Sequence, residues 1–192
     1  MFPISHFNIT KTPFYYYDKT LLSNTLAKLI RLAGERNYHV HYAVKANANP
    51  EILKLIAASG IGADCVSGGE IKAALEAGFP AKKIVFAGVG KADWEIEYAL
   101  EKKIFCFNVE SAEELSVIEE LAKKKENIAS IALRINPNID AHTHEYITTG
   151  LSENKFGIPI EMLDSIFSQI QRSPHVQLVG FHFHIGSQIL NL

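Results

Sequence analysis

Short β-prone runs recur along the chain at nearly constant spacing, and this repeat constrains the fold more than any other feature. The runs begin near His39, Gly62, Ile84, Ile104, Ser130 and Gln177. The first four intervals are 23, 22, 20 and 26 residues, and helical runs fill them. Strands and helices alternating at this spacing indicate βα units around a parallel sheet. A leucine-rich repeat has a similar period, but its LxxLxLxxN pattern does not recur here.

The helical runs carry their own start and stop signals. Ser67 and Ser111 each follow a β-prone run and precede a glutamate by three residues, which is the capping-box pattern. Gly60 and Gly78 stand where helices should end, because glycine adopts the left-handed conformation at low cost. The pair Gly68-Gly69 has a second interpretation, a phosphate cradle at a helix N-terminus, which a lone glycine pair does not decide.

The segment before the repeat differs from it in pattern. Residues 12–18 are aromatic and strand-like, and a helical run with an apolar face follows and ends at Gly34. We therefore expect an N-terminal strand and helix over residues 1–35, leading into a repeating domain over residues 36–192.

The composition excludes several classes of protein. Apolar residues make up 47% and charged residues 21%, and the net charge is -2, so no general attraction to nucleic acid or to acidic membranes is expected. There is no uninterrupted apolar window of about 18 residues and no secretory leader pattern. Cys65 and Cys106 lie in apolar runs without CxxC spacing, which favours buried free thiols in a reducing compartment. We expect a cytoplasmic protein.

Lys45 lies where the first β-prone run of the repeat ends. Val40, Tyr42 and Val44 alternate as in a strand, and Asn49-Pro50 then resembles a helix start. Ligands bind at the carboxyl ends of strands in parallel α/β folds, so the amine is a candidate nucleophile that can form a Schiff base with a carbonyl. Position alone leaves a second possibility open, an ordinary lysine reaching from a strand end into solvent.

The spacing of the repeat breaks after Asn136-Pro137, where a long polar segment over residues 140–154 precedes the last run. Long loops in compact domains are often functional. His142 with His144, and His182 with His184, suggest a zinc site, but no carboxylate or thiol is spaced with them as a ligand set, so we predict no metal. His184 at the end of the last run could stack on a flat cofactor, act as an acid or belong to the core.

Eight segments carry a resemblance to a known family, and they occur in that family's order along the entire chain. The segments are Thr12–Tyr15, Tyr42–Asn47, Asp64–Glu70, Phe86–Lys91, Arg134–Pro137, His144–Gly150, Lys155–Gly157 and His182–Gln188. Together they resemble the diaminopimelate decarboxylases, enzymes that depend on pyridoxal 5'-phosphate (PLP) and are built on a barrel of the alanine-racemase type.

The resemblance implies an α/β fold, a PLP-binding (β/α)8 barrel of which residues 36–192 supply about six strands. The chain would then be an amino-terminal fragment, and the family's carboxy-terminal β-domain would be absent. For the site, the resemblance implies catalytic roles for Lys45, which bonds to the cofactor, and for His184, which stacks against the pyridine ring. It places Ser187 at the phosphate and Asp64 and Arg134 along the cofactor site.

The activity implied by the resemblance is decarboxylation of meso-2,6-diaminopimelate to L-lysine and CO2, by a homodimer when the protein is full length. Two alternatives stay open. One is a related barrel enzyme acting on arginine, ornithine or carboxynorspermidine, or a racemase. The other is a truncated chain that binds PLP without catalysis.

Overall fold

The computed structural model describes residues 4–137 and 156–185. It divides into two compact units, Met1–Tyr38 and His39–Leu192, which are described separately.

The first unit contains two helices, α1 (Ile4–Phe7) and α2 (Lys19–Gly34). Asp18 caps α2, since its Oδ1 accepts a hydrogen bond from the backbone N–H of Leu21 at 2.9 Å. The strand expected over residues 12–18 does not form. A run of β-prone aromatic residues gives a strand only where a neighbouring strand takes up its hydrogen bonds, and here the rings of Phe14 and Tyr16 pack against Phe7 instead, with centroids 5.4 and 5.1 Å away.

The second unit is built on one parallel sheet. Its strands within the described residues are β1 His41–Ala43, β2 Gly62–Cys65, β3 Ile84–Phe86, β4 Cys106–Val109, β5 Ala129–Asn136, β6 Ile158–Pro159 and β7 Val176–Phe183. Its helices are α3 Pro50–Ala58, α4 Gly68–Glu76, α5 Asp93–Lys102, α6 Ala112–Lys124 and α7 Leu163–Gln171. Single 3-10 turns lie at η1 Val44–Ala46, η2 Ala81–Lys83 and η3 Ile160–Met162.

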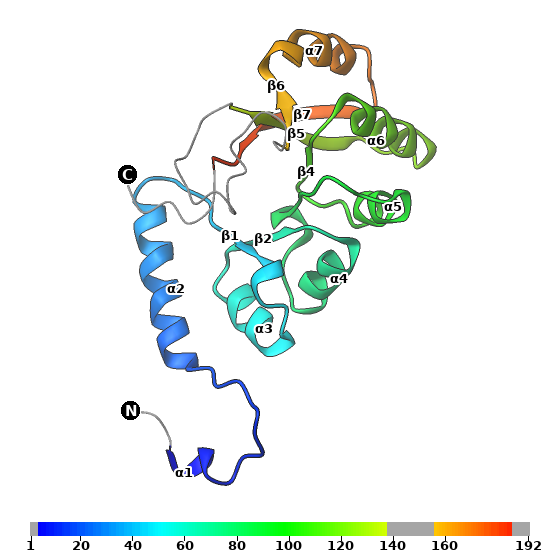
Figure 1. The fold of residues 1–192 in the computed structure, drawn as a ribbon. Helices are drawn as coiled ribbons and strands as arrows, with labels where there is room; N and C mark the ends of the chain where they lie inside the picture. Colours follow the sequence, from blue (N-terminus) through cyan, green and yellow to red (C-terminus); the bar gives the residue numbers. More distant parts are fainter. Residues whose placement is uncertain (1–3, 138–155, 186–192) are drawn as a thin grey trace, which may run out of the picture. The chain divides into compact units, whose positions relative to one another are not determined.

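The strand order shows how the sheet is wound. Strands β1, β2, β3, β4, β5 and β7 are neighbours in that order and all pair in parallel, and β6 pairs with the end of β5. Helices α3 to α7 lie in an arc on one side of the sheet (Figure 1). A barrel keeps its strands in chain order, whereas the order of a doubly wound sheet reverses at a switch point. The predicted βα repeat is therefore confirmed as a partial barrel wall, and β6 is a short strand that the sequence did not predict.

The core lies between the sheet and these helices. Ile56, Ile71, Ile96 and Leu115, one from each of α3 to α6, are almost completely buried. Each helix thus turns an apolar stripe onto the strands, as an amphipathic pattern requires. Transfer of such a side chain out of water contributes roughly 1.5–3 kcal/mol, so this layer is the main source of cohesion in the unit.

The predicted helix caps are present. The Oγ atoms of Ser67 and Ser111 accept hydrogen bonds from the backbone N–H groups of Glu70 and Glu114 at 3.2 and 3.1 Å. Each cap directly follows a strand, so it fixes both the helix start and the loop at the carboxyl edge of the sheet.

The two thiols are buried and free, as the sequence predicted. Burial raises the pKa of Cys65 to about 12 and that of Cys106 to about 11, so both stay protonated at neutral pH.

Across the part of the chain that the structure describes, no helix has the length and apolar character needed to cross a bilayer.

Candidate cofactor site

Lys45 lies in η1, immediately after β1 and at the carboxyl edge of the sheet. Val44 beside it is completely buried, whereas the side chain of Lys45 is exposed. The loop that follows is held in place because the hydroxyl of Tyr42 donates to the carbonyl of Asn47 at 3.1 Å. The local sequence thus anchors the backbone on both sides and leaves the amine free to meet a ligand.

Asp64 lies on β2, in register with Ala43 of β1. Its Oδ1 is buried and has no hydrogen-bond partner among the described residues. Burial raises the pKa of this carboxyl group, and the positive charges of Lys45, His41 and Arg134 oppose the rise. Asp64 therefore lies within electrostatic reach of basic side chains from two distant parts of the sheet.

Arg134 lies on β5 and forms an ion pair with Glu110, which follows β4. The Arg134 Nη1 and Glu110 Oε1 atoms are 2.6 Å apart, and only 13% and 5% of the two side chains are exposed. The guanidinium also lies 5.3 Å from the ring centroid of Phe156. These contacts with Glu110 and Phe156 define the orientation of the Arg134 guanidinium.

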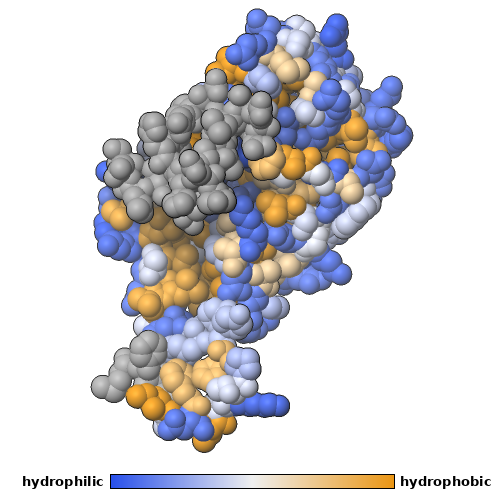
Figure 2. Space-filling view, viewed as in Figure 1, coloured by the Kyte–Doolittle hydropathy of each residue, from blue (hydrophilic) through white to orange (hydrophobic). Residues whose placement is uncertain are grey.

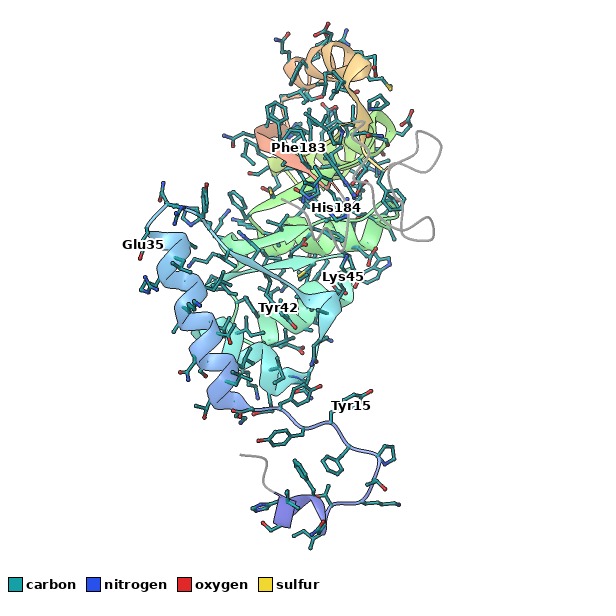
Figure 3. The ribbon with its side chains drawn as sticks, turned by 60° about the vertical axis from the view of Figure 1, so that its left-hand side comes forward. Tyr15, Glu35, Tyr42, Lys45, Phe183 and His184 are labelled. Carbon is teal, nitrogen blue, oxygen red and sulfur yellow. The ribbon has the colours of Figure 1, made fainter. Side chains whose placement is uncertain are left out.

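Two histidines end the last strand. His182 is paired in register with Arg134, is partly buried, and keeps a buried Nδ1 atom without a partner in the described residues. Burial lowers the pKa of His182, and the nearby Arg134 charge lowers it further. His184 follows directly after β7 and is exposed. Figure 3 shows Lys45 and His184, which follow the first and last strands of the sheet, in η1 and after β7.

The structure brings four of the predicted site residues to one edge. Electrostatic interactions link Asp64 to Lys45 and to Arg134, and link His182 to Arg134 and to His184. Ser187, the predicted phosphate ligand, lies outside the described residues. So do His142 and His144 of the zinc alternative.

Below this edge, the inner face of the sheet holds a cavity of about 390 Å³, which is within the size range of small-molecule sites. Polar side chains lining it include His41, Asp64, Asn108 and His182. The phosphate cradle considered at Gly68-Gly69 is disfavoured, because the N–H of Gly68 already donates to Glu95 Oε1 at 2.7 Å.

Sequence reasoning missed Glu110 at this edge and His41 in the cavity below it. Glu110 stands between β4 and the Ser111 cap. Its position after a buried strand, the same signal that identified Lys45, would have marked it as a candidate.

Comparisons with known proteins agree with this geometry. Residues 23–192 match a family model described as the pyridoxal binding domain of pyridoxal-dependent decarboxylases. The chain is 58% identical to the diaminopimelate decarboxylase of Bacteroides thetaiotaomicron, over 100% of this chain and 50% of that protein. It is 48% identical to the corresponding protein of Helicobacter pylori strain J99, over 97% of this chain and 46% of that protein.

Solved structures give the same result. A mutant diaminopimelate decarboxylase of Helicobacter pylori, complexed with L-lysine, superimposes with a TM-score of 0.91 at 46% identity, over 98% of this chain and 48% of that one. An arginine decarboxylase of a Paramecium bursaria Chlorella virus gives 0.79 at 24% identity, over 98% and 48%, and shares the fold. The chain spans about half the length of the curated relatives it matches.

A parallel βα barrel wall that carries an exposed lysine, a buried carboxylate and histidines at its carboxyl edge defines a cofactor-binding barrel of the PLP class. The chain belongs to the pyridoxal-dependent decarboxylase family, and it carries that family's pyridoxal-binding domain. Its cofactor is therefore PLP.

The residues at the edge fit this cofactor. Lys45 offers an exposed amine for the aldehyde, and the imidazole of His184 is flat enough to stack on the ring. Lys91 lies at the same edge but is 1% exposed, and its ammonium is already bound to protein acceptors. The buried, unpartnered atoms of Asp64 and His182 are expected where a polar ligand completes the hydrogen bonding.

Proposed function

We propose that this chain is the cofactor-binding half of an enzyme that decarboxylates meso-2,6-diaminopimelate to L-lysine and CO2. The observation that carries the proposal is the 58% identity, along the whole chain, to the diaminopimelate decarboxylase of Bacteroides thetaiotaomicron. The similar Helicobacter pylori and M. jannaschii enzymes bind L-lysine in their structures, and L-lysine is the product of this reaction.

In this proposal the amine of Lys45 would hold the cofactor through its aldehyde. His184 would stack on its ring, and Ser187 would help to hold its phosphate. Asp64 and Arg134 line the site. When bound, PLP accepts the electron pair that is released as the carboxylate leaves.

The likeness to the viral arginine decarboxylase shows the fold alone, so the fold does not select the substrate. The His144–Gly150 segment and the His184–Gln188 ending favour diaminopimelate over arginine, ornithine or carboxynorspermidine. We also propose a cytoplasmic homodimer for the complete protein. The buried free thiols Cys65 and Cys106 support the reducing compartment.

The test joins residues 1–192 to the half of the Bacteroides relative that this chain does not span. With PLP and meso-diaminopimelate, this chimera should release CO2 and L-lysine, and Lys45→Ala should abolish both. A second chimera carries the corresponding half of the viral arginine decarboxylase and is given arginine. Activity of the second chimera but not the first would refute the proposed substrate class, and folded, PLP-loaded but inactive chimeras would favour a non-catalytic chain.

A further inference from the structure

Lys91 is a buried lysine that has no part in the proposed chemistry. It follows β3, only 1% of its side chain is exposed, and its Nζ lies 5.4 Å from the ring centroid of Phe86. The ammonium donates to the carbonyls of Gly88 and Asn108 at 2.7 and 2.9 Å and to Glu114 Oε1 at 2.5 Å. An ammonium has three N–H groups, so each one has an acceptor. A lysine buried so completely is rare unless it is paired.

The acceptor Glu114 leads from Lys91 back to the site. Its second oxygen, Oε2, accepts the backbone N–H of Glu110 at 2.7 Å. Glu110 in turn places Oε1 at 2.6 Å from Nη1 of Arg134. An unbroken series of polar contacts therefore runs from the loop after β3, through the start of α6 and the end of β4, to a guanidinium on β5.

The charges along this series are balanced. Lys91 and Arg134 are cations, Glu110 and Glu114 are anions, and at most 14% of any of the four side chains is exposed. Without Lys91, the guanidinium of Arg134 would be the one cation in this series beside the two buried carboxylates of Glu110 and Glu114. Burial already raises the pKa of Glu114, and the Lys91 charge opposes that rise. Glu110 Oε2 has no partner among the described residues, so the Arg134 contact through Oε1 is what orients the carboxylate.

We propose that Lys91 is a positioning residue of the cofactor site, which fixes the guanidinium of Arg134 through Glu114 and Glu110. The inference rests on the proposed function in one respect, the placing of Arg134 beside the cofactor. Lys91 itself touches neither cofactor nor substrate, because its three donors are used within the protein. A purely structural Lys91 would stabilise the loop after β3 without affecting Arg134.

The first test observes Arg134 directly, without cofactor. The four arginines of the chain give few guanidinium NMR signals, and loss of one set in Arg134→Lys assigns Arg134. In Lys91→Met, the Nη signals of Arg134 should move toward those of a freely rotating, exposed arginine. The matched control is Lys83→Met, at the opposite end of β3, where Nζ donates to the Gly60 carbonyl at 2.6 Å. That variant should leave the Arg134 signals in place.

Glu114→Gln provides a second route in case Lys91→Met does not fold. The amide offers one acceptor instead of two, so one of the two contacts of Glu114 is lost. The Arg134 signals should again move. Unchanged Arg134 signals in the folded variants, or equal changes in the Lys83→Met control, would overturn the proposal.

The second test measures PLP affinity by titration of absorbance. Lys91→Met should weaken PLP binding about tenfold, which is a typical effect for a residue that acts on a site through a network of contacts. Lys83→Met should leave the affinity for PLP unchanged. On an Arg134→Lys background, Lys91→Met should have no further effect, since its effect passes through Arg134. Additive losses would contradict the inference. If the unmodified chain bound no PLP at Lys45, the proposed function would fail, while the guanidinium signals would still decide this inference.

Discussion

Asp64 is held in the site at a cost to stability. Its carboxylate is largely buried, with one oxygen unpartnered among the described residues, and the charges of Lys45, His41 and Arg134 do not fully compensate. The pKa of Asp64 is therefore higher in the folded chain than its usual value near 3.8. Ionisable groups with shifted pKa values are common in cofactor sites, because they contribute to binding or catalysis rather than to the stability of the fold.

The sign of the pH effect follows from this shift. A carboxyl group with a raised pKa favours the folded state below its unfolded pKa, and this contribution is lost as pH rises through the folded pKa. Asp64→Asn should therefore raise the melting temperature of the cofactor-free chain at pH 7, by roughly 1–3 °C, and raise it less at pH 4. Thermal melts followed by circular dichroism measure both values.

The matched control for that experiment is Asp164→Asn, at an exposed position in the first turn of α7. It should give no such stabilisation at pH 7. A lower melting temperature for Asp64→Asn at pH 7 would show that the surrounding positive charges outweigh the burial of the carboxylate.

At the residue scale, the sequence predicts those site residues that stand at the end of a β-prone run. Lys45 was found because it ends a β-prone run ahead of a helix start. Lys91 was not found, since its partners Asn108 and Glu114 stand 17 and 23 residues away. Glu110 pairs with Arg134 across 24 residues. Contacts of this kind exist only once neighbouring βα units are packed side by side.

At the scale of elements, the junction of β5 and β6 is closely packed beside Arg134. Gly157, just before β6, has φ +97°, and a Cβ there would lie 2.8 Å from the Arg134 carbonyl oxygen and 3.2 Å from Arg134 Cγ. Only glycine fits both the left-handed backbone and the close approach. The position of β6 therefore depends on close packing of Gly157 against Arg134.

Gly157→Ala should destabilise the chain by about 1–3 kcal/mol, because it adds backbone strain and a steric clash. It should also shift the Arg134 guanidinium signals. Gly90→Ala is the control, since a Cβ at Gly90 meets nothing within 4 Å. Urea unfolding measures the two stabilities, and equal values for both variants would contradict the packing described for β6.

The sequence predicted the larger elements well because their signals are local. Every strand it predicted in the repeat begins within two residues of the observed start, as periodicity and caps allow. It missed β6, which has two residues and no period to detect. It was wrong over residues 12–18, where a run of aromatic residues gave ring packing rather than a strand.

At the scale of the whole molecule, β7 presents an apolar stripe to solvent. Val179, Phe181, Phe183 and Ile185 alternate along its end, and each is between 42% and 55% exposed. Apolar side chains are also visible among polar ones on the face shown in Figure 2. A strand of this kind at the edge of a sheet favours association with other chains.

We expect the chain to self-associate as its concentration rises, and Phe183→Lys to reduce this association. Sedimentation velocity over a concentration series measures the effect. Ile128→Lys, at another exposed apolar position, should change little. A monomer at every concentration, unaffected by Phe183→Lys, would contradict this expectation.

The fold class and the family could be predicted from the sequence because the βα period and eight ordered segments extend along the chain. The role of Ser187 stays a prediction, and this residue lies outside the described residues. The predicted boundary between residues 35 and 36 stays a prediction, and the first compact unit ends at Tyr38 along the chain.

The most direct test of the account is whether PLP bonds to Lys45 in this chain. The chain is mixed with PLP, reduced with borohydride, digested and examined by mass spectrometry, beside Lys45→Ala and Lys54→Ala, the latter removing an exposed lysine on α3. One reduced PLP group is expected on the peptide that contains Lys45, and it should be kept in Lys54→Ala and absent from Lys45→Ala. An adduct on another lysine that persists in Lys45→Ala, or none at all in the folded chain, would contradict this expectation.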